Sequence, residues 1–118
     1  MEEQIEVLRT AYEYLDKLMK GTLVAADDFH SGQENKGFQS VSLIADGTLW
    51  LIEAIELTRQ VQKKEIMTAG IMAKITEINE AMQKKDMVLI ADLLEFEVVP
   101  ILQMWQMGIQ DSIGSALA

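Results

Sequence analysis

Few residues of this chain have types and spacings that could support chemistry, and His30 is the first of them. It is the single histidine, and it lies between two carboxylates, Asp27 and Glu34. Such a trio could hold a metal ion. A di-metal helical bundle, however, takes a Glu-x-x-His pair from each of two helices, and the sequence contains no such pair. We therefore expect His30 to be a solvated residue at a helix end, where a cation complements the helix dipole.

Phosphoryl transfer through His30 is an alternative, because phosphotransfer domains are helical bundles of this size with one exposed histidine. Those domains keep the histidine in mid-helix and follow it closely with lysine and glycine. Here Ser31 and Gly32 come next, and Lys36 follows too late. This pattern favours the structural interpretation of His30.

Paired carboxylates are the second candidate for chemistry. Three pairs have a spacing of three residues, which places both members on one helix face: Glu53 with Glu56, Glu77 with Glu80, and Asp92 with Glu95. Acid–base catalysis also needs a pocket that separates the two pKa values, and no nucleophilic cysteine or phosphate-binding glycine loop accompanies the pairs. We predict a solvated helix face, no enzyme activity, and no metal or cofactor.

Composition restricts the partners. The chain has 118 residues, 49% of them hydrophobic, and a net charge of −9, so binding to nucleic acid or an anionic membrane is disfavoured. The apolar stretch 87–109 contains Asp92, Glu95 and Glu97, which disfavours membrane insertion. The N-terminus is acidic where a secretory signal is basic. We expect one cytoplasmic domain spanning residues 1–118.

Helices must position all these residues, because apolar side chains recur at alternating spacings of three and four. The pattern predicts helices at about 3–30, 37–62, 66–84 and 87–109, with Asp86 as an N-cap and a kink near Pro100. Residues 110–118 are expected to fray. The fold class predicted is all-α, an antiparallel up-down-up-down four-helix bundle; three helices with a bent central one are the second choice.

Methionine content is the one feature that suggests binding. The chain has eight methionines, and methionine is common on adaptable contact surfaces. If Leu94, Val98, Ile101 and Trp105 face the bundle interior, then Val99, Met104 and Met107 form a loose outer patch that binds a partner. The alternative is that the 87–109 helix is central and buried on all sides.

Two segments carry a family resemblance, residues 38–56 and 82–105. The second contains a lysine–aspartate entry, an acidic run with an aromatic residue, a proline and a tryptophan: Lys85, Asp86, Leu93, Leu94, Glu95, Phe96, Glu97, Pro100 and Trp105. The chain resembles small, uncharacterised all-helical proteins of Gram-positive bacteria. That resemblance implies a helical fold and no particular chemistry.

The sequence therefore predicts a non-enzymatic helical bundle that acts through protein–protein contact, as a homodimer, an adaptor or a chaperone-like binder of a helical partner. One alternative is a phosphorelay or metal-carboxylate component that uses His30. Another is a small-molecule sensor with an apolar pocket among Trp50, Phe96 and Trp105. Solution mass and partner identity would separate these hypotheses.

Overall fold

Helices are the regular elements of this chain, as a computed structural model describing residues 1–117 shows. The all-helical prediction is confirmed for this part of the chain. Three α-helices are followed by a fourth helix that changes type along its length. In chain order the elements are α1 (Glu2–His30), α2 (Glu34–Leu57), a 3₁₀ turn (Arg59–Val61), α3 (Gly70–Gln83), α4 (Met87–Asp92), a π-helical segment (Leu93–Val98), α5 (Val99–Ile113) and a second 3₁₀ turn (Gly114–Ala116).

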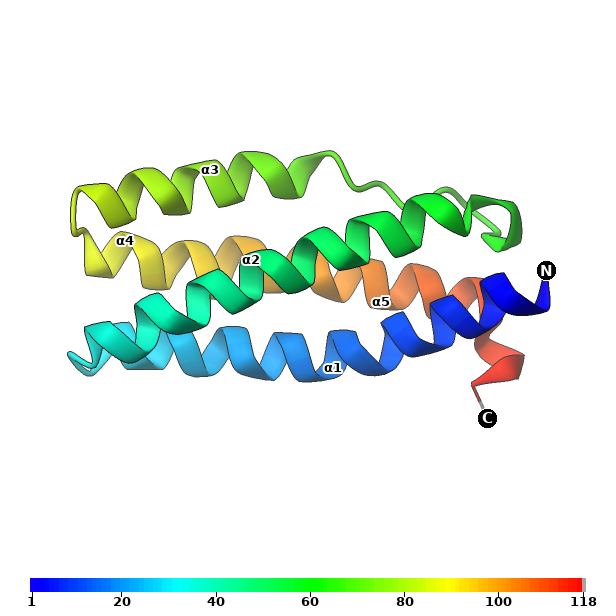
Figure 1. Cartoon of the computed structure of the whole chain (residues 1–118), viewed down its shortest axis with the longest axis horizontal. Helices are drawn as coiled ribbons and strands as arrows, with labels where there is room; N and C mark the ends of the chain where they lie inside the picture. The colour runs from blue at the N-terminus through cyan, green and yellow to red at the C-terminus, as the bar shows by residue number, and fades with distance from the viewer. Residues whose placement is uncertain (118) are drawn as a thin grey trace.

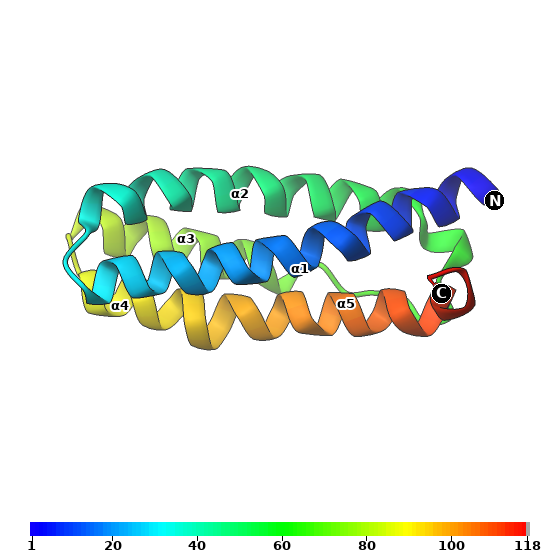
Figure 2. The ribbon, with the colours of Figure 1, turned by 90° about the horizontal axis from the view of Figure 1, so that it is seen from below.

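The helices lie side by side along the long axis of a molecule that measures 45 × 25 × 19 Å (Figures 1 and 2). Helix α1 packs against α2 on one side and against α4, the π-helical segment and α5 on the other. Helix α3 packs against α4 and the π-helical segment. Figure 1 shows both termini at the same end of the molecule. Large apolar side chains fill the interior, among them Leu8, Leu15, Leu51, Ile55, Ile90, Leu94, Leu102, Trp105 and Ile109.

The turn from α1 to α2 is short because α1 ends in a compact motif. Gly32 adopts a left-handed conformation with φ 83°, and the Gln33 N–H donates to the Asp28 carbonyl at 2.8 Å. This is a Schellman motif, which satisfies carbonyls at the helix end and reverses the chain. The break predicted between residues 30 and 37 is therefore only three residues long, and α2 begins at Glu34 rather than at 37.

Helix α2 ends earlier and α3 begins later than the sequence pattern predicts. The pattern gave 37–62 and 66–84, whereas the helices are Glu34–Leu57 and Gly70–Gln83. Two side chains capture the last carbonyls of α2: the Thr58 hydroxyl donates to Ala54 O at 2.7 Å, and the Gln62 amide donates to Ile55 O at 2.8 Å. After the 3₁₀ turn, residues 62–69 form a non-helical connection, which is longer than the predicted turn.

The fourth helix is continuous from Met87, where the Asp86 carboxylate caps it by accepting from Leu89 N–H at 3.1 Å, as predicted. The irregularity expected at Pro100 takes the form of the π-helical segment immediately before it. Pro100 consequently lies in the first turn of α5, where its missing N–H is tolerated. Helix α5 continues to Ile113, four residues beyond the predicted end at 109. Fraying of 110–118 stays a prediction, and residue 118 lies outside the described residues.

Candidate functional site

The outer patch predicted on the fourth helix is present in part. Met104 and Met107 are 67% and 71% exposed, whereas Val99 is only 7% exposed. Val99 therefore does not belong to an exposed patch, which corrects that prediction. The π-helical segment is the reason, because a π turn advances by more residues than an α turn and leaves Val98 and Val99 both facing the core.

A third methionine joins Met104 and Met107 from a different part of the chain. Met67 belongs to the 62–69 connection and is 65% exposed. We call Met67, Met104 and Met107 the methionine surface. They border a cavity of about 270 Å³, whose other walls come from residues 64–66 and from Trp105, Gly108 and Asp111. The patch is thus built by α5 together with the connection beside it.

Specific contacts hold the connection against α5. The Trp105 indole N–H donates to the Met67 carbonyl at 2.9 Å, and the Lys63 backbone N–H donates to the Ser112 hydroxyl at 3.0 Å. Gly108 permits the closest approach, because a Cβ at that position would lie 2.9 Å from Ile66 Cγ1. Met67 is therefore fixed in place by its backbone, while its side chain stays exposed.

An ionic cluster fixes the connection to the end of α2. The Arg59 guanidinium donates to both carboxylate oxygens of Glu56, at 2.8 and 2.9 Å, and also binds Glu65. The Thr68 hydroxyl donates to Glu56 at 2.8 Å. The hydrogen bonds from Arg59 and then from Thr68 lower the pKa of Glu56 below its ordinary value. These groups are exposed and satisfied by one another, which favours a structural role.

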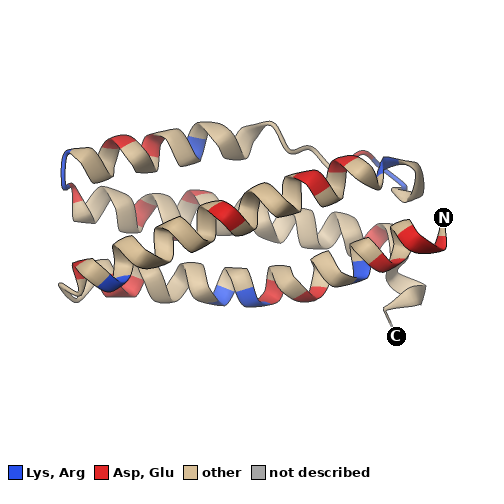
Figure 3. Cartoon of the chain, viewed as in Figure 1, with Lys and Arg blue, Asp and Glu red and all other residues tan. Residues whose placement is uncertain are grey.

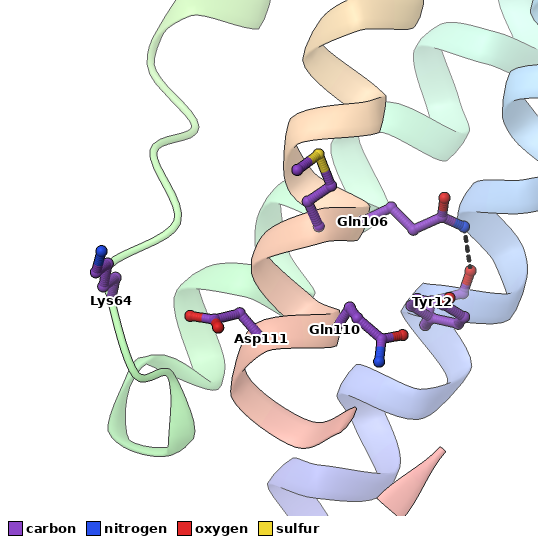
Figure 4. A pocket seen from close by; sticks show the side chains of 6 residues that line it. Tyr12, Lys64, Gln106, Gln110 and Asp111 are labelled. Carbon is purple, nitrogen blue, oxygen red and sulfur yellow. Dashed lines mark hydrogen bonds between the residues drawn. The ribbon is translucent and has the colours of Figure 1, made fainter. Parts of the chain in front are cut away.

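A second cavity adjoins the first and shares Lys64, Met107 and Asp111 with it. It has a volume of about 470 Å³ and is lined by Tyr12, Lys64, Gln106, Met107, Gln110 and Asp111. Figure 4 shows Asp111 reaching from α5 toward the connection that carries Lys64, while the Gln106 amide donates to the Tyr12 carbonyl at 3.4 Å. Most of the side chains that line this cavity are long and polar. The cavity therefore gives the methionine surface a polar border.

The structure separates the residues of the alternative hypotheses. His30 is the exposed last residue of α1, and within residues 1–117 no group of three histidine, aspartate or glutamate side chains could hold a metal. Trp105 is buried, whereas Trp50 and Phe96 are exposed. The Trp50 ring packs edge-on against Tyr14, with 5.7 Å between the ring centroids. The two tryptophans line separate cavities, so the apolar pocket expected among them is not formed.

Sequence reasoning missed a second apolar surface on α2. Leu43, Trp50 and Leu57 are spaced by seven residues, which places them on one face of a helix, and all three are exposed. The excess of apolar residues around Trp50 was the available signal. Two cavities, of about 180 and 310 Å³, lie between this face and α1.

None of the helices within residues 1–117 has both the length and the apolar character needed to cross a membrane. Comparisons with curated proteins and with solved structures gave no significant match. One family model matches residues 6–108, which is nearly the whole chain. The match includes both helical segments on which the resemblance to a helical family rested. The chain therefore belongs to the family described as Domain of unknown function (DUF8042).

Proposed function

We propose that this protein is a non-enzymatic helical bundle that acts through protein–protein contact, as an adaptor or chaperone-like binder of a helical partner. The observation that carries the proposal is the methionine surface. Three exposed methionines from two chain segments surround one cavity, and unbranched methionine side chains can repack around different apolar shapes. An amphipathic helix that lays its apolar face against such a surface is the partner this chemistry fits.

We also infer that the scaffold is an antiparallel up-down-up-down bundle. Only three residues join α1 to α2. Residue numbers fall along α1 as they rise along α2 in the contacts between the two helices: Phe29 lies against Gly37, and Tyr14 lies against Gly47. Termini at the same end of the molecule fit an even number of passes. A net charge of −9 favours a soluble, cytoplasmic protein, because a net charge far from zero opposes non-specific aggregation.

Photo-cross-linking in cells tests the proposed binding. A photo-reactive residue replaces Met104 or Met107 in turn, and the matched control replaces Met72, an exposed methionine on α3 that does not line the cavity. We expect discrete products at 104 and 107 and none at 72. Mass spectrometry of the products should map the partner's contact to an amphipathic helical segment.

The double variant Met104→Lys, Met107→Lys completes the test. Because both side chains are exposed, we expect the helical circular dichroism spectrum to stay unchanged while the cross-linked product disappears. Two outcomes would contradict the proposal: products at 104 and 107 no stronger than at 72, or a double variant that no longer folds. The second outcome would mean that these methionines serve the core.

A further inference from the structure

The groove between α1 and α2 is bordered by one stripe of residues from each helix. On α2, Leu43 and Trp50 line its cavities, and Leu57 continues their row toward the end of the helix; the three are 69%, 40% and 74% exposed. Seven-residue spacing keeps them in one row along the helix, as at a single position of a coiled-coil heptad. A row of this kind on a helix already packed in a bundle has the pattern of a seam for a further helix.

The other wall of the groove comes from α1. Thr10, Tyr14, Lys17 and Gly21 follow one another at spacings of four, three and four, so they share one helix face. Tyr14, Lys17 and Gly21 line one cavity with Leu43, and Thr10 and Tyr14 line the next cavity with Trp50. The two cavities therefore follow one another along the groove with Tyr14 between them, and Thr10 and Gly21 leave room on the α1 side.

Charge differs between the two helices beside the groove. On α2, Asp46 and Glu53 flank the apolar row, at spacings of three and four, and both are acidic. Helix α1 contributes Lys17 to the groove itself, with the acidic Glu13 one turn before it. Figure 3 shows acidic turns along the middle and end of α2, and both basic and acidic turns near the middle of α1. Asp46 lies one turn from Leu43, and Lys17 shares a cavity with Leu43, so Asp46 and Lys17 are at the same level along the bundle.

We propose that this groove binds a second copy of the chain, with the two-fold axis running parallel to the groove. Rotation about that axis places α1 of each copy against α2 of the other and keeps neighbouring helices antiparallel. Lys17 of each copy then faces Asp46 of the other, so the ion pair occurs twice. A two-fold axis perpendicular to the helices would instead stack α2 on α2 and bring acidic rows together, which is unfavourable.

A charge swap measured by analytical ultracentrifugation tests this inference on the full chain. We expect the wild-type chain to sediment at twice its 13.3 kDa mass. Lys17→Glu and Asp46→Lys should each raise the dissociation constant by about tenfold or more, because each creates two like-charge contacts. The double variant Lys17→Glu, Asp46→Lys restores opposite charges across the axis and should recover the dimer.

The matched control is Lys20→Glu, which makes the same charge change one turn away at a residue that pairs with Asp16 and does not line the groove. We expect no effect on the dimer. A monomeric wild type, an assembly larger than a dimer, or a double variant as weak as the singles would overturn the inference. The groove involves α1 and α2 and not the methionine surface, so cross-linking at residues 104 and 107 should persist in every variant.

Discussion

Two glycines within helices differ in what surrounds them, and this difference predicts opposite effects of the same substitution. A Cβ at Gly47 would lie 2.0 Å from the Tyr14 hydroxyl and 3.0 Å from its Cζ, whereas a Cβ at Gly21 would meet nothing within 4 Å. Gly47→Ala should therefore destabilise the fold by about 1–3 kcal/mol through overpacking. Gly21→Ala should stabilise it by about 0.5–1 kcal/mol, because glycine is unfavourable in a helix interior.

Urea denaturation followed by circular dichroism measures both changes. Tyr14→Phe in the Gly47→Ala background serves as a control, because it removes the atom that the new methyl group meets first. Part of the lost stability should return. Equal effects at Gly47 and Gly21 would contradict the close packing of Tyr14 against α2.

The exposed position of His30 predicts that folding tolerates its loss. His30 ends α1 and is exposed, so His30→Ala should change stability by no more than about 0.5 kcal/mol. Denaturation together with a metal-binding titration by calorimetry checks this expectation. A loss of several kcal/mol would contradict the expectation, and binding of one equivalent of Zn²⁺ that disappears in the variant would support a metal site at His30.

Individual exposed residues were predictable from the sequence to different degrees. Met104 and Met107 followed from helical periodicity, because they lie opposite the buried face of a regular helix. The burial of Val99 did not follow from helical periodicity, because the π-helical segment changes the helical register just before this residue. Met67 was placed in a helix by the same periodicity, although it belongs to the connection. Its position depends on the hydrogen bond from Trp105, a contact between residues 38 positions apart.

At the scale of elements, two helix ends use the same motif with different residues, and this yields a further prediction. The end of α3 repeats the Schellman pattern of α1: Asp86 N–H donates to Ala81 O at 2.9 Å, and Lys85 N–H donates to Met82 O at 3.1 Å. Lys85 occupies the left-handed position with φ 54°, where α1 has Gly32. Lys85→Gly should stabilise the protein by about 1 kcal/mol, because an L-residue is strained in that conformation.

Lys84→Gly is the control for this prediction, because Lys84 has right-handed φ and ψ values of −85° and −3°. Glycine gains nothing there and should be neutral or destabilising. Thermal denaturation of both variants measures the difference. If both glycines stabilise the protein equally, the effect comes from removal of a lysine charge and not from the backbone.

Helix existence was predictable because each helix buries one periodic apolar stripe, and the Asp86 cap followed from residue type alone. The end of α2 was not predictable from the sequence, because no glycine or proline marks it. Thr58 and Gln62 end the helix instead, by hydrogen bonding to Ala54 and Ile55. Thr58 is also buried, and a local pattern does not reveal which polar side chain will turn back to the backbone.

At the scale of the whole molecule, the groove and the methionine surface give the bundle two separate apolar faces, one on α1 and α2 and the other on α5 and its connection. Exposed apolar faces do not make a chain with a net charge of −9 more soluble, and on soluble proteins such faces mark interaction sites. Their presence on different helices fits a protein that binds its own copy with one face and a helical partner with the other.

Self-association through the groove predicts that thermal stability depends on protein concentration. Dimerisation binds only the folded chain, so by mass action a higher concentration raises the melting temperature. We expect the wild-type melting temperature to rise across a hundredfold concentration series, and the Lys17→Glu variant to show a weaker rise or none. Restoring the pair with Asp46→Lys should bring the dependence back. Met104→Lys, Met107→Lys should keep the wild-type dependence, because those side chains lie outside the groove; loss of the dependence in that variant would place the self-contact on the methionine surface instead.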